Sequence, residues 1–205
     1  MKLNDLEKAV RKHTGEFFCE RINDHQKTKA VSFRHVVDAP EDSINLPTVG
    51  RLNDFYETFG SALFYYDEKS GDAAKRLAPS SEWAELHADF SDWLEPLDED
   101  ERVEILPDWI DTCLVIGETP RSGNYILVAT EGPAAGHIFE FDHDGYEFID
   151  AAADVVEYVE KILKPDDVKL VDIASHMRFI EDDSMVQWWI RELKDNTGHV
   201  ASTRD

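Results

Sequence analysis

The acidic side chains around His143 are the strongest candidates in the sequence for a catalytic or binding site. The segment Phe139-Glu-Phe-Asp-His-Asp-Gly-Tyr-Glu-Phe148 has an Asp-Gly step between two alternating apolar runs. That step predicts a two-residue hairpin loop, because both residues readily adopt positive φ. The hairpin would place Asp142 opposite Glu147. Since side chains alternate along a strand, these two and Glu140 would share the face opposite the phenylalanines.

Carboxylates that face each other across two strands destabilise a hairpin, so we expect something to compensate for them. Three sources are open: a neighbouring arginine or solvent, a basic side chain of a protein partner, or a metal ion. With a metal ion, Glu140, Asp142, His143 and Glu147 would form a hydrolase site in which the metal activates water. With a protein partner, Glu140, Asp142 and Glu147 would be binding residues.

A second acidic group follows Pro96 and is the densest anionic patch of the chain. Asp98, Glu99, Asp100, Glu101 and Glu104 surround a single basic residue, Arg102. Such a run is typical of a solvated loop, and it could also contact a basic partner. We therefore predict a loop here, with Asp98, Glu99, Asp100 and Glu101 as partner-binding residues.

Other catalytic and cofactor patterns are missing from the sequence. It has no dinucleotide fingerprint, no phosphate loop, no Gly-x-Ser-x-Gly elbow and no zinc spacing of His and Cys. The Asp-His-Asp-Gly turn also lacks the regularly spaced oxygen ligands of a calcium loop. The best-supported expectation is a protein with no cofactor, no metal and no catalytic residues.

The composition predicts one acidic folded domain, residues 1–205. Among 205 residues, 44 Asp and Glu oppose 21 Lys and Arg, giving a net charge of −23. With 42% hydrophobic and 11% aromatic residues the chain can bury a core. So negative a field disfavours nucleic acid or an anionic membrane as the main partner. Generic solubility or adaptation to high salt is the alternative reason for the acidity.

The sequence also predicts a cytoplasmic location. The N-terminus lacks the apolar core of a secretory signal, and no apolar run reaches the roughly 20 residues needed to span a bilayer. The two cysteines, Cys19 and Cys113, are far apart and outside any Cys-x-x-Cys spacing. Two free thiols in a reducing compartment are the natural interpretation.

Apolar periodicity and turn residues predict the elements that would position these groups. We expect an α+β fold, in which a mainly antiparallel meander is flanked by helices. Helices are expected over 3–13, from Pro47 to Gly60, from Ser80 or Ser81 to Leu94, from an Asp150 cap to 163, and over 184–198. Strands are expected over 30–37, 61–66, 112–117, 125–130, 137–142 and 146–149, with a frayed tail over 199–205.

The middle of the chain resembles a known family. The runs Ile116-Gly-Glu-Thr-Pro-Arg-Ser-Gly-Asn-Tyr125 and Gly136-His-Ile-Phe-Glu-Phe-Asp-His-Asp-Gly145, followed by the alanine-rich helix 151–163, resemble the SUKH superfamily. The segment from Leu46-Pro47 to Phe59-Gly60 is similar to that family's first helix. The resemblance covers about 46–164, with an N-terminal extension over 1–45 and a C-terminal helical extension over 165–205.

The SUKH superfamily unites Smi/Knr-type regulators of fungal cell-wall synthesis with bacterial immunity proteins. The resemblance implies a SUKH-like α+β sheet and a role in binding without catalysis. Immunity members neutralise toxins, commonly nucleases, and a cationic nuclease would suit an acidic partner. The preferred hypothesis is therefore an immunity protein that binds a basic toxin domain. A regulatory adaptor that binds cellular enzymes is the runner-up, and a metal-dependent hydrolase is a minor alternative.

Overall fold

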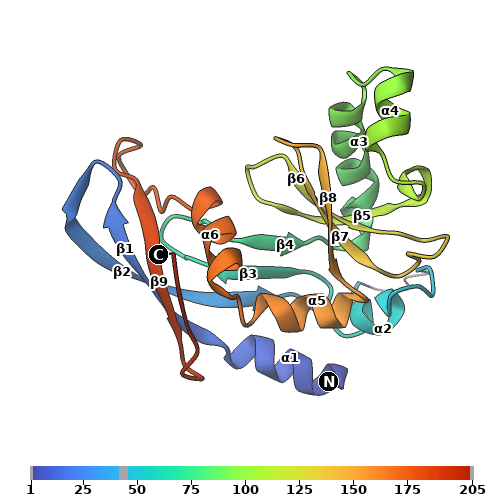
Figure 1. Ribbon diagram of the computed structural model, residues 1–205. Coiled ribbons are helices and arrows are strands. Elements are labelled where there is room, and N and C mark those ends of the chain that lie inside the picture. Colours follow the sequence, from blue (N-terminus) through green and yellow to red (C-terminus); the bar gives the residue numbers. More distant parts are fainter. Residues whose placement is uncertain (1, 42–45, 204–205) are drawn as a thin grey trace.

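The computed structural model describes residues 2–41 and 46–203, and it shows an α+β fold built on a ten-stranded sheet (Figure 1). The strand order is β10-β9-β1-β2-β3-β4-β5-β6-β7-β8, and every pair is antiparallel. The predicted α+β fold with an antiparallel meander is thus confirmed. The strands are β1 (Thr14–Arg21), β2 (Asp24–Val37), β3 (Ala62–Tyr66), β4 (Lys75–Leu77), β5 (Leu114–Thr119), β6 (Asn124–Val128), β7 (Ile138–Asp142), β8 (Glu147–Ala152), β9 (Trp188–Asp195) and β10 (Val200–Ser202).

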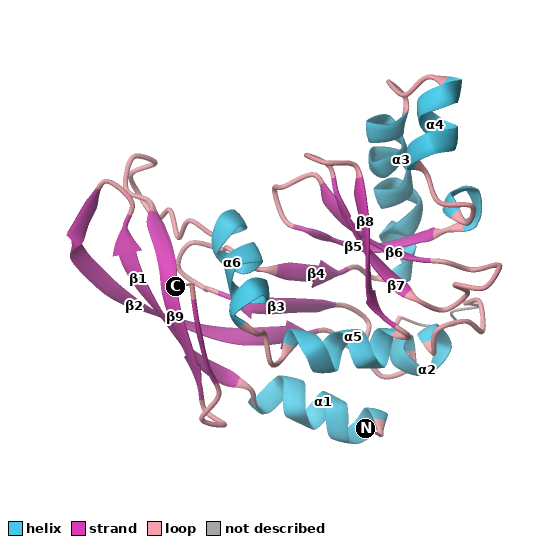
Figure 2. Ribbon diagram, viewed as in Figure 1, coloured by secondary structure: helices cyan, strands magenta, loops and turns pink. Residues whose placement is uncertain are grey.

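Six α-helices and two short 3-10 helices accompany the sheet in the described part of the chain (Figure 2). Their bounds are α1 (Leu3–Lys12), α2 (Leu52–Tyr56), η1 (Ser80–Glu82), α3 (Trp83–Leu94), α4 (Glu99–Ile105), η2 (Ile110–Thr112), α5 (Val155–Ile162) and α6 (Asp167–His176). No helix among the described residues is long and apolar enough to cross a bilayer.

Both ends of the chain enter one group of strands, the terminal arm, which consists of β10, β9, β1 and β2. The N-terminal strand β1 lies between β2 and the C-terminal strand β9. The predicted helix over 184–198 is therefore wrong, because most of it is β9. The predicted frayed tail is also wrong for residues 200–202, which form β10; residues 204–205 lie outside the described residues.

A β-bulge explains why β9 has the apolar spacing of a helix. The pairing of β9 with β1 slips between Glu192 and Ile190, so Arg191 is an extra residue in the strand. The slip brings Ile190 and Leu193 onto the same buried face although they are three residues apart. A spacing of three indicates a helix when the sequence is considered alone.

The terminal arm joins the rest of the sheet at a short seam between β2 and β3. Its paired residues are Arg34 with Tyr66, Val36 with Leu63 and Val37 with Ala62. The register shifts within this seam, and Tyr65 has a φ of 57°. The seam is therefore an irregular junction between two otherwise regular groups of strands.

The other half of the sheet, β5 to β8, is covered on both faces. Along β7, Phe141 packs against Phe90 of α3, whereas the neighbouring Glu140 bonds to Tyr158 of α5. Because adjacent strand residues point to opposite faces, α3 lies on one face and α5 on the other. The terminal arm and the pair α3–α4 lie at opposite ends of the molecule (Figure 1).

Two further predicted helices have different starts. The helix expected from Pro47 begins only at Leu52, because Gly50 and Arg51 have φ values of 52° and 60°. Gly50 is required there, since a Cβ would lie 2.3 Å from the carbonyl oxygen of Gly136. That helix also ends at Tyr56 instead of continuing to Gly60.

The helix expected after Asp150 is capped by a later aspartate. Asp150 belongs to β8, and the carboxylate of Asp154 accepts hydrogen bonds from the amides of Val156 and Glu157. The expected serine caps before α3 are also not formed, because the hydroxyls of Ser80 and Ser81 donate to Glu41 instead.

Candidate functional site

Helix α3 positions the densest acidic group of the chain, which follows it directly in the sequence. Its apolar stripe, Trp83, Leu86, Phe90 and Leu94, is buried. The indole of Trp83 donates to the carbonyl of Ala78, and the Phe90 ring packs against the rings of Tyr125 and Phe141. This packing holds the helix on one face of strands β5 to β7 and leaves its polar side toward solvent.

The predicted acidic loop is a helix, α4, and two of the predicted binding residues start it. Asp98 accepts a hydrogen bond from the amide of Glu101 (2.9 Å), and the Glu101 carboxylate accepts one from the amide of Asp98 (3.0 Å). This reciprocal capping box satisfies amides at the helix start. The prediction of a loop is therefore wrong: capping and acidic residues in the first turn favour a helix here.

Helix α4 stands out from the body of the protein. None of its residues is buried, and Glu99 and Asp100 are exposed. Arg102 holds it to the preceding helix by donating to the carbonyl oxygen of Leu94 (2.7 Å). The apolar side chain of Val103 is 82% exposed among the carboxylates.

We define the acidic surface as the eleven exposed carboxylates between Trp83 and Thr112, over which the chain has a single basic residue other than histidine, Arg102. The surface comprises Glu85, Asp89, Asp92, Glu95, Asp98, Glu99, Asp100, Glu101, Glu104, Asp108 and Asp111. Within the described residues, no lysine, arginine or histidine forms an ion pair with any of them. The charge of this surface is consequently not neutralised by the residues that the structure describes.

The hairpin carboxylates form a smaller acidic group near the end of α3. Asp142 pairs with Glu147, as predicted, and Glu147 is exposed. The turn differs from the predicted one, because the positive φ (50°) is at Tyr146 and neither Asp144 nor Gly145 has one. Contacts to α3 explain this: the Tyr146 hydroxyl donates to the carbonyl of Trp93.

His143 connects this hairpin to two neighbouring elements. Its backbone amide donates to Oδ1 of Asn124, and its Nδ1 lies 2.6 Å from the same oxygen. Because an amide oxygen can only accept hydrogen bonds, Nδ1 is the donor and carries a hydrogen. The imidazole also packs on Trp93 of α3, with ring centres 4.5 Å apart. His143 therefore positions the hairpin tip beside the acidic surface.

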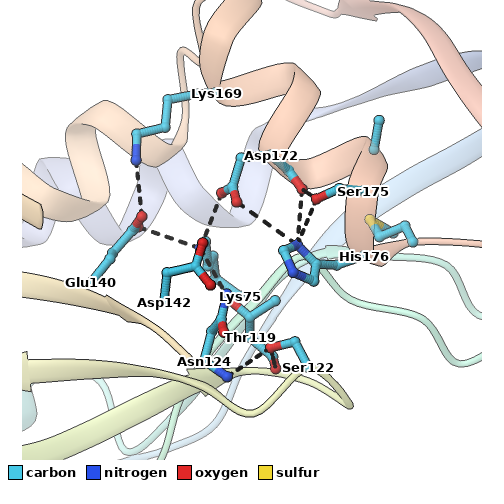
Figure 3. Close-up of polar contacts among 12 residues, drawn as sticks. Lys75, Thr119, Ser122, Asn124, Glu140, Asp142, Lys169, Asp172, Ser175 and His176 are labelled. Carbon is cyan, nitrogen blue, oxygen red and sulfur yellow. Dashed lines mark hydrogen bonds and ion pairs between the residues drawn. The ribbon is translucent and has the colours of Figure 1, made fainter. Parts of the chain in front are cut away.

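Glu140 differs from the other predicted binding residues, because it is buried and bonded inside the protein (Figure 3). Lys169 donates to its Oε2 (2.9 Å), Tyr158 donates to its Oε1 (2.8 Å), and Lys75 Nζ lies 3.5 Å from Oε1. Its compensation thus comes from lysines of the chain itself. Its carboxylate has no free face to offer a partner.

What we call the buried ion cluster is centred on the buried Lys75 and Glu140, includes the partly exposed Lys169 and Asp172, and was not foreseen in the sequence. The ammonium of Lys75 contacts Thr119 Oγ1 (3.0 Å) and Asp172 Oδ2 (3.2 Å) as well as Glu140. It thereby ties β4 to β5, β7 and α6. The only sequence signal for α6 is weak: an Asp166 cap before the apolar residues Leu170 and Ile173.

Charge and burial shift the pKa values in this cluster. Burial alone would raise the pKa of Glu140, but Lys75 and Lys169, helped by hydrogen bonds, lower it to about 2. Burial would lower the pKa of Lys75, and Glu140 and Asp172 raise it above its ordinary value. Both groups are therefore charged near neutral pH.

The buried ion cluster has no room for a substrate. The two cavities beside it measure about 50 and 20 Å³, enough for one or a few waters. Among the described residues no three His, Cys, Asp or Glu side chains are arranged to hold a metal ion, so the hairpin residues considered for a hydrolase form no such group. The geometry of the cluster indicates a role in holding α6 on the sheet.

Comparisons of the chain with models of protein families, with curated proteins and with solved structures found no match. The SUKH resemblance therefore stays a prediction based on the motifs alone.

Proposed function

We propose that this chain is a non-catalytic protein-binding domain, an immunity protein of the SUKH type that neutralises a basic nuclease-type toxin. The single observation that carries the proposal is the acidic surface, whose eleven exposed carboxylates lack ion-pair partners among the described residues. Several carboxylates elsewhere, such as Glu140 and Glu118, are paired with lysine or arginine.

The composition of the acidic surface suits a cationic protein. A nuclease that binds a polyanion presents clustered cations, and complementary charge speeds the encounter of two proteins. The exposed Val103 adds an apolar contact in the midst of the charges, which protein interfaces use and simple counter-ions do not. The free, buried thiols of Cys19 and Cys113 are in keeping with a cytoplasmic location for this encounter.

The first test is to recover the partner from native cytosol with the tagged protein, elute it with a salt step and identify it by mass spectrometry. We expect a basic toxin domain whose nuclease activity the purified chain inhibits. Recovery of a housekeeping enzyme alone would instead favour the Smi/Knr-type adaptor. Elution that does not depend on salt would contradict binding through the acidic surface.

The second test measures association with the purified toxin by stopped flow. The acidic-surface variant reverses three carboxylates that take no part in capping α4: Glu99→Lys, Asp100→Lys and Glu104→Lys. We expect its association rate constant to fall at least about tenfold at low salt, because electrostatic steering raises such rates by one to three orders of magnitude.

A matched control carries the same change in net charge elsewhere on the surface. It reverses three exposed carboxylates outside the acidic surface: Glu57→Lys, Glu131→Lys and Glu192→Lys. We expect its association rate to stay within about threefold of the wild-type rate. Equal losses in both variants would show that net charge, and not the acidic surface, governs binding.

A further inference from the structure

A chain of hydrogen bonds runs through the interior of the terminal arm. The amide of Tyr65 lies 3.0 Å from His35 Nδ1, His35 Nε2 lies 2.7 Å from His13 Nδ1, and His13 Nε2 lies 2.7 Å from Asp195 Oδ2. Both histidines and Asp195 are buried. We call these four residues the histidine relay; it links β3, β2, the end of α1 and β9.

The donors and acceptors of the histidine relay fit together in a single arrangement. An amide can only donate, so His35 Nδ1 must accept from Tyr65 and His35 Nε2 must carry the hydrogen. That hydrogen is donated to His13 Nδ1, which leaves His13 Nε2–H to donate to the Asp195 carboxylate. Each imidazole is therefore neutral, and each ring nitrogen is used once.

An added proton on either imidazole would disrupt this arrangement, because every ring nitrogen already donates or accepts a hydrogen bond. On His35 Nδ1 it would oppose the amide hydrogen of Tyr65. A proton on His13 Nδ1 would point at the hydrogen already on His35 Nε2. The clash could be relieved only if His35 changed tautomer and carried its hydrogen on Nδ1 instead. In both cases His35 Nδ1 carries a hydrogen and can no longer accept from the Tyr65 amide. One added proton therefore breaks the hydrogen bond from Tyr65 of β3 to His35 of β2.

The broken hydrogen bond lies at an irregular part of the sheet. His35 and Tyr65 occupy the register shift of the seam between β2 and β3, where only three residue pairs join the terminal arm to β3. Tyr65 also has a positive φ (57°), which a tyrosine adopts only at a cost. The hydrogen bond from the Tyr65 amide to His35 is one of the contacts that maintain this conformation.

The surroundings offer little to offset a positive charge at His35. Its ring is enclosed by the rings of Phe33, Phe64 and Tyr65. Around His13, at the other end of the histidine relay, the charged groups are Asp195 of β9, Lys12 of α1, and Glu160 and Lys164 at the end of α5. Asp195, the carboxylate of the histidine relay, thus contacts His13 and is separated from His35 by the His13 ring.

We propose that the histidine relay is an acid-sensitive latch, which holds the terminal arm to β3 at neutral pH and releases the seam when a histidine is protonated. The latch lies at the seam between β2 and β3, shares no residue with the acidic surface and does not depend on the proposed function.

The direction of the pH effect follows from linkage. Burial, and then the neighbouring His13, lower the pKa of His35 from 6.5 to about 3. A histidine in the opened seam would titrate near 6.5, so the open form binds the proton more readily. The seam is therefore most stable above pH 6.5, and its stability falls as the pH drops from 6.5 toward 3. One proton per opening gives a tenfold rise in the open fraction per pH unit.

Hydrogen exchange of wild-type amides tests the latch directly. After correction for intrinsic rates, we expect the protection of the Leu63, Tyr65 and Tyr66 amides to fall about tenfold between pH 5.5 and 4.5. Amides between β5 and β6, such as that of Leu127, should keep constant protection over this range. Protection of the seam that does not change with pH, or that changes equally in β5 and β6, would overturn the proposal.

Two variants and one spectroscopic measurement complete the test. His35→Leu should abolish the pH dependence at the seam, whereas His25→Leu, which changes an exposed histidine of the same strand, should preserve it. If His35→Leu does not fold, the nitrogen-15 shifts of the wild-type imidazoles still decide the question. They should show a hydrogen on Nε2 of both His35 and His13 at pH 7; a hydrogen on Nδ1 of His35 would refute the latch.

Discussion

One lysine side chain, Lys75, places a positive charge inside the core of this very acidic protein. The buried Lys75 ammonium has three protons and meets three oxygens, those of Thr119, Glu140 and Asp172. A buried charge whose hydrogen-bonding groups are all satisfied is stable in the folded state, while a buried charge that has lost its partner is strongly unfavourable. The cluster should therefore respond sharply to the loss of one member.

Replacing the buried ammonium tests how much the cluster stabilises the fold. Lys75→Met should lower the free energy of unfolding by about 3–5 kcal/mol, because it leaves Glu140 with one lysine and Asp172 with none. Denaturant titration measures the loss. The control Lys164→Met removes an exposed lysine and should change stability by less than about 0.5 kcal/mol. Similar losses in the two variants would contradict the structural role of the cluster.

The lowered pKa of Glu140 gives a second prediction at this scale. A carboxyl group with a pKa of about 2 when folded and 4.5 when unfolded stabilises the protein fully above pH 4.5 and loses this contribution as the pH falls toward 2. The contribution is on the order of 3 kcal/mol. Glu140→Gln should therefore flatten the stability profile between pH 4.5 and 2, measured by urea unfolding. A wild-type slope retained in this variant would show that other groups cause it.

At the scale of elements, local patterns predicted those parts whose neighbours in sequence are also neighbours in space. The strands β5 to β8 and helix α3 have regular apolar periods bounded by turn residues, and they were foreseen within a few residues. The terminal arm was largely missed. The first part of β2 has an almost entirely polar sequence, and β9 contains a bulge that imitates helical spacing.

The candidate site, like the fold, could be predicted from the sequence only in part. The acidic surface could be located from charge density alone, since consecutive acidic residues cannot all be buried. The burial of Glu140 could not be predicted, because Lys75, Tyr158 and Lys169, which surround it, come from three other elements. Only the tertiary fold brings these side chains together.

The capping box of α4 supports a prediction about one element. Asp98→Ala removes the side chain that accepts from the Glu101 amide, and N-cap losses of this kind cost about 1 kcal/mol. Because α4 buries no residue, we expect faster hydrogen exchange in α4 with an unchanged global melting temperature. Asp100→Ala, in the same turn but outside the cap, should leave exchange nearly unchanged. A global loss equal to the local one would mean that α4 is integral to the core.

For the whole molecule, the net charge of −23 sets the response to salt. The eleven exposed carboxylates of the acidic surface repel one another, and added ions screen this repulsion. We expect the melting temperature to rise between 0.01 and 0.5 M sodium chloride. The acidic-surface variant, whose three reversals change the charge by 6 to −17, should rise less. A melting temperature that falls with salt would indicate that attractive ion pairs dominate.

The position of β1 between β2 and β9 has a consequence for how the protein is made. The ribosome completes the β1–β2 hairpin when β9, its other neighbour, has not yet been translated. Until then one edge of β1 has no strand beside it and can pair with any extended chain nearby. The newly made chain is thus most exposed to mispairing before β9 emerges, and slow translation of the region before β9 would prolong that interval.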